Sequence, residues 1–416
     1  MTVRTAAAGL TELPAYLYDL SALRAHAAAV RAALPERVEL YYAAKANPEA
    51  PILAALHGLV DGYEVSSGGE LAHVHATVPD APLAFGGPGK SPEEIAAALR
   101  LPAVRRWHVE SERELRALAA AADRPVDVLL RANLPVGDDA LDGVALAMGG
   151  RPTPFGMDPD RIEDCLALLA SPGFERLRLR GIHAHLASGL TAAEHLRVAG
   201  RIVDWSAGLA ARHGLPLHEV NVGGGMAVDY GDPDARFDWA AFGEGLDKLL
   251  ARHPGVTTLR IEPGRALTAH CGWYVTEVLD VKHSHGEAFA VVRGGTHHLR
   301  TPATRGHSQP FTVLPVEGWP HPWPRPAATD TRVTVAGQLC TPKDVLAARA
   351  PVAGLRAGDR LLFAMAGAYA WNISHHEFLM HPRPAFHYLR GDRGPVLPAH
   401  RRLPGAAAGV DAADDS

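Results

Sequence analysis

Between residues 38 and 262, short apolar runs alternate with longer helical patterns. Runs rich in Val, Leu, Ile and Tyr predict strands, and the Ala- and Leu-rich stretches between them predict helices. The predicted strands are Val38–Ala44, Gly62–Val65, Leu83–Gly86, Trp107–Glu110, Val126–Ala132, Leu179–His185, Glu219–Val222 and Leu259–Glu262. The predicted helices include Pro92–Arg100, Glu112–Ala121, Asp160–Ala170 and Ala192–His213.

This alternation indicates the fold class. Strands that alternate with helices form right-handed βαβ units, in which the strands are parallel. Eight such strands over this length favour a closed (β/α)8 barrel, the TIM barrel, over an open sheet. We therefore expect an α/β barrel domain over residues 25–270.

The pattern changes after Glu262, where strands follow one another without long helices. The predicted strands here are Trp273–Val281, Phe289–Arg293, Arg332–Gly337 and Arg360–Phe363. They indicate a second, all-β barrel domain over residues 271–400, to which residues 1–24 contribute the strand Ala15–Asp19. Six prolines between Pro310 and Pro326 predict an irregular loop. The small, acidic tail, residues 401–416, is expected to be disordered.

Composition narrows the function classes. The chain has 416 residues, of which 47% are hydrophobic, enough for two domains. A net charge of −5 gives no reason to expect nucleic acid or a membrane as partner. Three cysteines without a C-x-x-C pair argue against a disulfide framework and favour a reducing compartment. We read no signal peptide and no membrane span, so we expect a cytoplasmic protein.

Polar residues and glycines gather at the predicted strand ends. The catalytic face of a (β/α)8 barrel lies at the carboxyl ends of its strands, where several loops converge. The residues found there are Lys45, Glu64, Arg131, His185, Ser188, Gly223, Gly224, Gly225, Glu262 and Arg265. Because they come from independent elements and meet at one face, together they are stronger evidence for an active site than any single motif.

Each of these residues also has a purely structural interpretation. Lys45, one of five lysines in the chain, could extend its amine to solvent at a strand end. If it is buried, we expect a lowered pKa, because only a neutral amine attacks an aldehyde. His185 could be a hydrogen-bonded core histidine, and the three glycines could serve a tight turn or bind a phosphate. Glu262 could cap its strand or keep a ring nitrogen protonated.

Taken in order, the motifs resemble a known family. They are Lys45 in A-K-A-N, His185-x-x-Ser188, Gly223–Gly225, Glu262-Pro-Gly-Arg265, Cys340-x-x-x-Asp344 and Gly367-Ala-Tyr369. Together they resemble the fold-type III decarboxylases that use pyridoxal 5′-phosphate (PLP). That group includes diaminopimelate, ornithine and arginine decarboxylases and shares its barrel with alanine racemase. The resemblance runs from about Pro14 to Tyr388.

The resemblance implies a role for each residue around the cofactor. Lys45 would hold PLP as a Schiff base, His185 would stack on the ring, and Glu262 would pair with the ring nitrogen. Glu64, where some relatives have aspartate, and Arg131 would support the cofactor. The implied phosphate ligands are Ser188, Gly223, Gly224, Gly225, Gly264, Arg265 and Tyr369.

The resemblance also implies how the substrate is handled. Cys340 would reach the active site of the second subunit in a head-to-tail homodimer and donate a proton, and Asp344 would belong to the same loop. His297, His298 and Arg300 lie where relatives select the distal end of an amino-acid-type substrate. The segment Ala368–Phe378 is similar to a subgroup that decarboxylates citryl-diamino-acid conjugates in siderophore assembly. Two imidazoles and a guanidinium suit such a carboxylate-rich substrate.

Several alternatives remain open. Diaminopimelate decarboxylase is the second candidate enzyme. An amino-acid racemase commonly has arginine near the ring nitrogen, so Glu262 argues against it. A non-catalytic PLP-binding homologue could lose Lys45 or Cys340, and both are present. We expect no metal site, since His375, His376 and His381 have no partner cluster.

Overall fold

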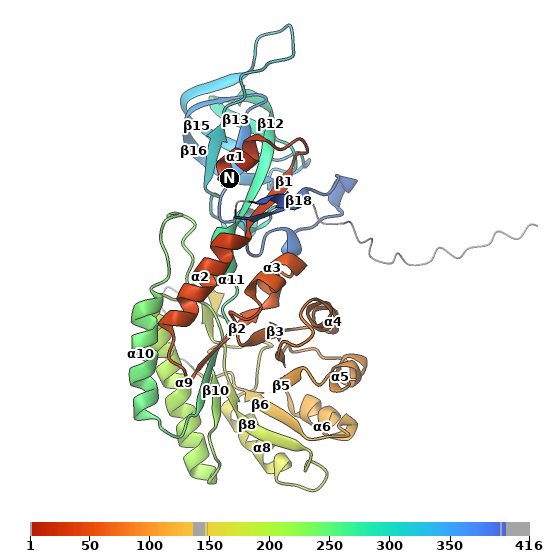
Figure 1. Ribbon diagram of the computed structural model, residues 1–416, viewed down its shortest axis with the longest axis vertical. Helices are drawn as coiled ribbons and strands as arrows, with labels where there is room; N and C mark the ends of the chain where they lie inside the picture. Colours follow the sequence, from red (N-terminus) through yellow and green to blue (C-terminus); the bar gives the residue numbers. More distant parts are fainter. Residues whose placement is uncertain (1, 136–145, 148, 392, 397–416) are drawn as a thin grey trace, which may run out of the picture.

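The computed structural model describes residues 2–135, 146–147, 149–391 and 393–396. Two lobes lie one above the other, joined by the helix α2 (Leu20–Ala33) and by the return of the chain after α11 (Arg265–Thr268) (Figure 1). The predicted tail lies outside the described residues. The boundaries of the two predicted domains stay a prediction.

The lower lobe is the predicted barrel. Its eight parallel strands close in the order β10-β11-β2-β3-β4-β5-β6-β8. The strands are β2 (Val38–Ala43), β3 (Gly62–Val65), β4 (Leu83–Phe85), β5 (Val104–Val109), β6 (Val126–Arg131), β8 (Leu177–His183), β10 (Glu219–Asn221) and β11 (Thr258–Ile261). The (β/α)8 prediction is therefore confirmed, with every predicted strand present.

Helices cover the outside of the barrel (Figure 1). They are α2, α3 (Ala50–Leu56), α4 (Gly68–Thr77), α5 (Pro92–Leu99), α6 (Glu112–Ala121), α8 (Pro159–Leu169), α9 (Ala192–His213) and α10 (Trp239–Arg252). Local sequence fixes their ends. Helix α9 begins at a capping box of Thr191 and Glu194 and ends at Gly214, whose φ of 61° suits glycine.

The upper lobe is a nine-stranded, mostly antiparallel and barrel-like sheet. Its main path runs β16-β15-β13-β12-β1-β18-β19, and β17 pairs with both β12 and β14. The strands are β1 (Ala15–Asp19), β12 (Gly272–Ser284), β13 (Glu287–Val292), β14 (Phe311–Leu314), β15 (Ala327–Ala336), β16 (Val345–Arg356), β17 (Arg360–Phe363), β18 (Ala385–Arg390) and β19 (Arg393–Val396). The predicted all-β second domain is confirmed.

The prediction of an irregular loop from Pro310 to Pro326 is wrong for one part of this segment. Strand β14 lies inside it and pairs antiparallel with β17. Pro310 and Pro315 flank this strand instead of interrupting it, so its backbone N–H groups remain free to pair. In the parts of the chain that the structure describes, no helix has the length and apolar character needed to cross a membrane.

Candidate active site

A cavity of about 820 Å3 opens where the barrel strands end. Loops after seven of the barrel strands contribute to its wall, and Tyr369 reaches it from the upper lobe. The sequence-predicted residues that line it are Lys45, Glu64, Arg131, His185, Ser188, Gly224, Gly225, Glu262, Gly264, Arg265 and Tyr369. The structure thus brings together nearly all the residues predicted for the cofactor.

Lys45 lies in the one-turn helix η1 (Ala44–Ala46), directly after β2. Its side chain is 44% exposed, and this exposed surface faces the cavity. The ammonium group donates a hydrogen bond to Glu64, whose other carboxylate oxygen accepts one from Ser66 Oγ at 2.7 Å. Lysine and carboxylate therefore form an ion pair at the cavity wall.

The predicted lowering of the Lys45 pKa is wrong for the cofactor-free protein. Burial lowers this pKa, but the charge and hydrogen bond of Glu64, together with the charges of Tyr369 and Glu262, raise it above its usual value. Burial opposes ionisation of Glu64 as well, yet Lys45 holds the pKa of that carboxyl below its usual value. Sequence reasoning considered burial alone, because the partner of Lys45 lies on the next strand. Glu64 thus keeps the free amine protonated and holds it at the cavity wall, and the amine must lose this proton before it can attack an aldehyde.

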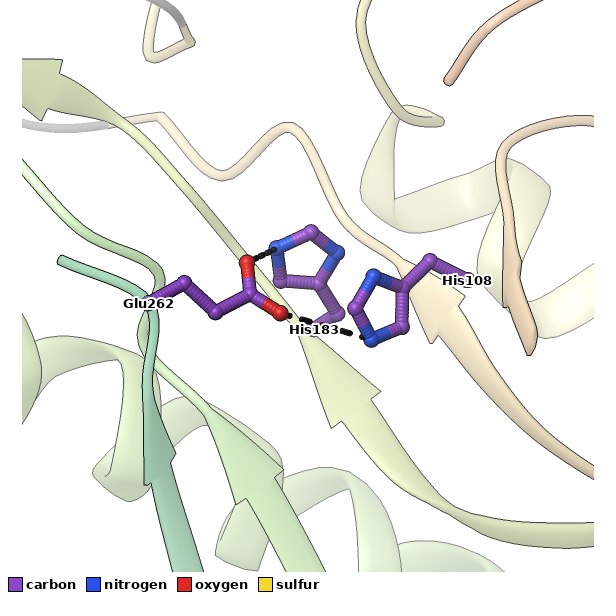
Figure 2. A group of neighbouring side chains, drawn as sticks. All are labelled: His108, His183 and Glu262. Atoms are coloured by element: carbon purple, nitrogen blue, oxygen red, sulfur yellow. Dashed lines mark ion pairs between the residues drawn. The ribbon is translucent and has the colours of Figure 1, made fainter. Parts of the chain in front are cut away.

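Glu262 lines the cavity, and two neighbouring histidines lie beside its carboxylate (Figure 2). Nε2 of His108 and Nε2 of His183 are each 3.7 Å from one of its oxygens. Asn221 donates a hydrogen bond to Oε1 at 2.7 Å. Burial, reinforced by Glu64, raises the pKa of Glu262 to about 7. Burial lowers the pKa of both histidines well below the usual value, so they stay neutral.

His108, His183 and Asn221 were missed by sequence reasoning. A signal existed for two of them, since His183 precedes His185 by two residues and Asn221 precedes Gly223 by two. The two histidines and Glu262 offer ligand atoms within 4.8 Å of one another, a set that could also hold a metal. We interpret them as positioning residues, because Glu262 faces the cavity and already accepts the Asn221 amide.

Two residues of the Gly223–Gly225 loop need to be glycine. The φ angles of Gly223 and Gly225 are 70° and 95°, where other residues are strained. A Cβ on Gly225 would lie 2.1 Å from the carbonyl oxygen of Ala187, and one on Gly223 would lie 2.5 Å from Nδ1 of His185. The loop therefore packs its backbone directly against the cavity wall.

The same loop leaves a backbone donor free for an anion. The N–H of Gly223 bonds to Asn221 Oδ1 at 2.9 Å, and that of Gly224 bonds to His185 Nδ1 at 3.2 Å. Within the described residues, the N–H groups of Gly225 and Gly264 have no acceptor. Both glycines line the cavity, so these donors can bind a phosphate group.

His185 presents a neutral ring to the cavity. Burial, with the charges of Arg131 and Lys45, lowers its pKa to about 3. Its Nδ1 accepts the N–H of Gly224, which leaves the proton on Nε2. Arg131 is itself fixed by an ion pair of 2.7 Å with Glu110. A neutral imidazole suits stacking on a flat ring.

The residues predicted to act on the substrate do not line the cavity of this chain. They are Cys340, His297, His298, Arg300 and Asp344. Cys340 and Arg300 are exposed, and the two histidines are buried. Asp344 is buried too, and its two oxygens accept the N–H groups of Thr296 at 2.6 Å and Leu339 at 2.8 Å. It therefore ties two loops together, and the predicted substrate roles stay predictions.

With this geometry described, comparison with known proteins decides the family. The model of the family described as "Pyridoxal-dependent decarboxylase, pyridoxal binding domain" matches residues 20–269. The chain belongs to the pyridoxal-dependent decarboxylase family. It is a PLP-dependent carboxy-lyase, as the resemblance implied.

Relatives of this decarboxylase support the assignment over nearly its whole length. It is 39% identical to 2-[(L-alanin-3-ylcarbamoyl)methyl]-2-hydroxybutanedioate decarboxylase of Staphylococcus aureus, covering 90% of this chain and 93% of that protein. It is 34% identical to a diaminopimelate decarboxylase of Actinosynnema pretiosum, covering 86% and 79%. The fold matches that of diaminopimelate decarboxylase from M. jannaschii with a TM-score of 0.83 at 21% identity, covering 96% and 92%.

The residues of this decarboxylase fit pyridoxal phosphate. The cavity offers an amine on Lys45, a buried carboxyl group on Glu262, and free N–H groups on Gly225 and Gly264. The cavity is also lined by the flat, neutral imidazole of His185. These are the groups that an aldehyde, a ring nitrogen, a phosphate and an aromatic ring require.

Proposed function

We propose that this decarboxylase removes the α-carboxylate from a conjugate of citrate and a small diamino acid, as an intermediate of siderophore assembly. The observation that carries the proposal is the 39% identity to the staphylococcal enzyme over 90% of this chain. The name of that enzyme describes 2,3-diaminopropionate joined through its side-chain amine to citrate. Such a substrate keeps one free α-amine and several carboxylates.

When bound, the cofactor supplies an aldehyde for the substrate amine and a ring that withdraws electrons from the bond being broken. The residues of the chain provide the rest. Glu64 accepts a hydrogen bond from the Lys45 amine and so positions it at the cavity wall. Glu262 holds a proton on the ring nitrogen, with Asn221 fixing its carboxyl group. The donors of Gly225 and Gly264 bind the phosphate.

We further propose that the active enzyme is a head-to-tail homodimer in which Cys340 donates a proton to the partner's site. Among the described residues no cysteine lines the cavity, since Cys165 and Cys271 are buried elsewhere. Cys340 is exposed and does not line the cavity of its own chain.

The surface around Cys340 supports this assembly. Asp344 ties the Cys340 loop to Thr296, and Arg300 N donates to Ser374 Oγ at 3.1 Å, so three loops form one surface. Exposed apolar side chains lie on it, namely Ile373, Phe378, Leu379 and Met380. We propose that a second copy covers them. A cytoplasmic location, where the three free cysteines would stay reduced, also remains part of the proposal.

The substrate is tested by measuring carbon dioxide release from a panel of amino acids. We expect kcat/KM for the citryl-diaminopropionate conjugate to exceed that for meso-diaminopimelate, ornithine and lysine by at least about a hundredfold, since the last two end in a cation. The 34% identity to a diaminopimelate decarboxylase makes meso-diaminopimelate the alternative. If meso-diaminopimelate proves the better substrate, the siderophore assignment is wrong.

A further inference from the structure

One end of the cavity carries a cluster of basic side chains that the roles assigned so far do not explain. Arg305 ends the short helix α12 (Thr301–Arg305), and Gly306, with a φ of 68°, turns the chain so that His307 also lines the cavity. The ring of His307 stacks on that of Tyr230 at 4.3 Å. Tyr230 in turn accepts a hydrogen bond of 2.7 Å from Arg265.

This end of the cavity holds two guanidinium groups, and neither forms an ion pair with a carboxylate among the described residues. Arg265 lies over the ring of Tyr369 at 4.5 Å, and its hydrogen bond goes to a neutral phenol. Arg305 forms no hydrogen bond or ion pair with any residue that the structure describes. Partial desolvation and the charge of Arg265 lower the pKa of Arg305, as expected where two cations repel each other.

The carboxylates that line the cavity are already engaged. Glu64 is paired with Lys45, and Glu262 accepts the amide of Asn221. Asp229 is exposed, and its Oδ1 accepts the N–H of Gly231 at 2.7 Å. An incoming anion is therefore the partner that the arginine pair lacks, and it would relieve their repulsion.

We infer that Arg305 and His307 form the subsite for the distal carboxylates of the substrate. The inference rests on the proposed function and names the residues that would select a polycarboxylate. The planar guanidinium of Arg305 can bind one carboxylate through two parallel hydrogen bonds. The ring of His307 is held by Gln309, whose Oε1 lies 3.2 Å from its Nε2, and forms the wall of the subsite beside Arg305.

A cofactor phosphate is the other anion that could occupy this end of the cavity. Arg265 and the free N–H groups of Gly225 and Gly264 already suffice for a phosphate. Arg305 comes instead from the upper lobe and remains exposed at its side of the cavity. The geometry therefore points to a substrate carboxylate, and the experiment below separates the two sources.

This inference moves the predicted selectivity from Arg300 to Arg305. The segment after β13 does reach the cavity, but Arg300 is exposed and does not line it. The hydroxyl of Thr301 donates a hydrogen bond to the carbonyl of Tyr369, and the turn that follows, with Arg305 and His307, lies at the cavity wall. Sequence reasoning chose the arginine nearest the glycine pair. The sequence alone could not show which of the two arginines lines the cavity.

The test uses the PLP-loaded enzyme and four variants. Arg305→Met removes the charge at similar length, and Arg305→Lys keeps the charge but loses the planar donor pair. Arg300→Met examines the arginine named by the sequence, and Arg100→Met controls for loss of an exposed arginine far from the cavity, at the end of α5. Citrate, which has no amine to react, is the binding probe. Its Kd is measured by calorimetry, beside the Kd of PLP and the KM of the conjugate.

We expect Arg305→Met to weaken citrate binding and raise the KM of the conjugate by about tenfold or more, with Arg305→Lys intermediate. The Kd of PLP and its absorbance should not change, and Arg100→Met should match the wild type. An equal loss of PLP affinity in Arg305→Met would assign Arg305 to the phosphate and overturn the inference. Normal citrate binding in Arg305→Met, or a loss confined to Arg300→Met, would also overturn it.

The outcome is independent of the substrate panel. If the wild type binds citrate and the Arg305→Met variant does not, the polycarboxylate subsite is supported even when the citryl conjugate is not decarboxylated. In that case only the proposed substrate fails, and another polycarboxylate amine becomes the candidate. A wild-type enzyme that decarboxylates the conjugate but does not bind citrate through Arg305 supports the function and overturns the subsite.

Discussion

The site residues differ from ordinary side chains mainly in the partners that set their charge. Lys45 was found from its position after a strand, but its charge state depends on Glu64, which belongs to the neighbouring strand. Glu262 was found in the same way, while its neighbours His108, His183 and Asn221 are buried on three other strands. Position along the sequence therefore locates a side chain, and only the fold supplies its electrostatics.

Glu262 should make the cofactor-free protein lose stability as pH rises. Its pKa rises from 4.5 to about 7 on folding because burial favours the neutral form. The resulting contribution is fully present below pH 4.5 and is lost as pH rises through 7. Glu262→Gln stays neutral, so relative to the wild type it should gain up to roughly 3 kcal/mol between pH 5 and 7.5.

Urea unfolding of both apo proteins at the two pH values gives this difference. The comparison cancels the opposite trend of the buried histidines, which both proteins retain. An unchanged stability difference between pH 5 and 7.5 would show that Glu262 stays ionised in the apo protein. The carboxyl group of Glu262 would then already be negatively charged when the cofactor binds.

At the scale of elements, sequence periodicity worked where strands are apolar and bounded by turn residues. All eight barrel strands and β17 were found in this way. Strand β16 was missed because Pro351 and Gly354 interrupt its pattern, and β14 was missed because prolines surround it. Arg305 was missed for a related reason, since it reaches the cavity from a short helix and not from the end of a barrel strand.

The glycine loop after β10 provides a prediction at this scale. Gly225→Ala should abolish tight PLP binding and destabilise the protein by more than about 2 kcal/mol, because its Cβ would collide with the Ala187 carbonyl. Gly214→Ala is the matched control, since Gly214 also has a positive φ but nothing lies within 4 Å of an added Cβ. It should cost only about 1 kcal/mol and keep PLP.

Thermal unfolding and PLP titration of the two variants check this. Equal losses in both would mean that backbone strain alone, and not the close approach of the loop to the cavity wall, accounts for the effect. A Gly225→Ala protein that binds PLP as tightly as the wild type would remove this loop from the phosphate site.

At the scale of the whole molecule, the site of a single chain lacks the thiol predicted to act in it. If Cys340 serves the partner's cavity, mixing Lys45→Ala with Cys340→Ala chains should restore activity, because hybrid dimers regain one complete site. Random exchange of subunits predicts about a quarter of wild-type activity. Sedimentation of the labelled mixture confirms exchange, and carbon dioxide release measures recovery.

Two results would contradict shared sites. One is full activity in a monomeric fraction. The other is no recovery in a mixture whose subunits have demonstrably exchanged. Either result would return Cys340 to a surface role and leave another group to donate the proton.

The position of β1 also constrains how the molecule is made. Ala15 pairs with Val275 on one side and with Ala385 on the other, so the first strand to be synthesised is placed between two of the later ones. The barrel can close during synthesis while β1 is still unpaired, because the partners of β1 are made later. Pairing over such distances in sequence is slow. The upper lobe should therefore be the last part of a newly made chain to fold, and until then its unpaired strand edges are open to aggregation.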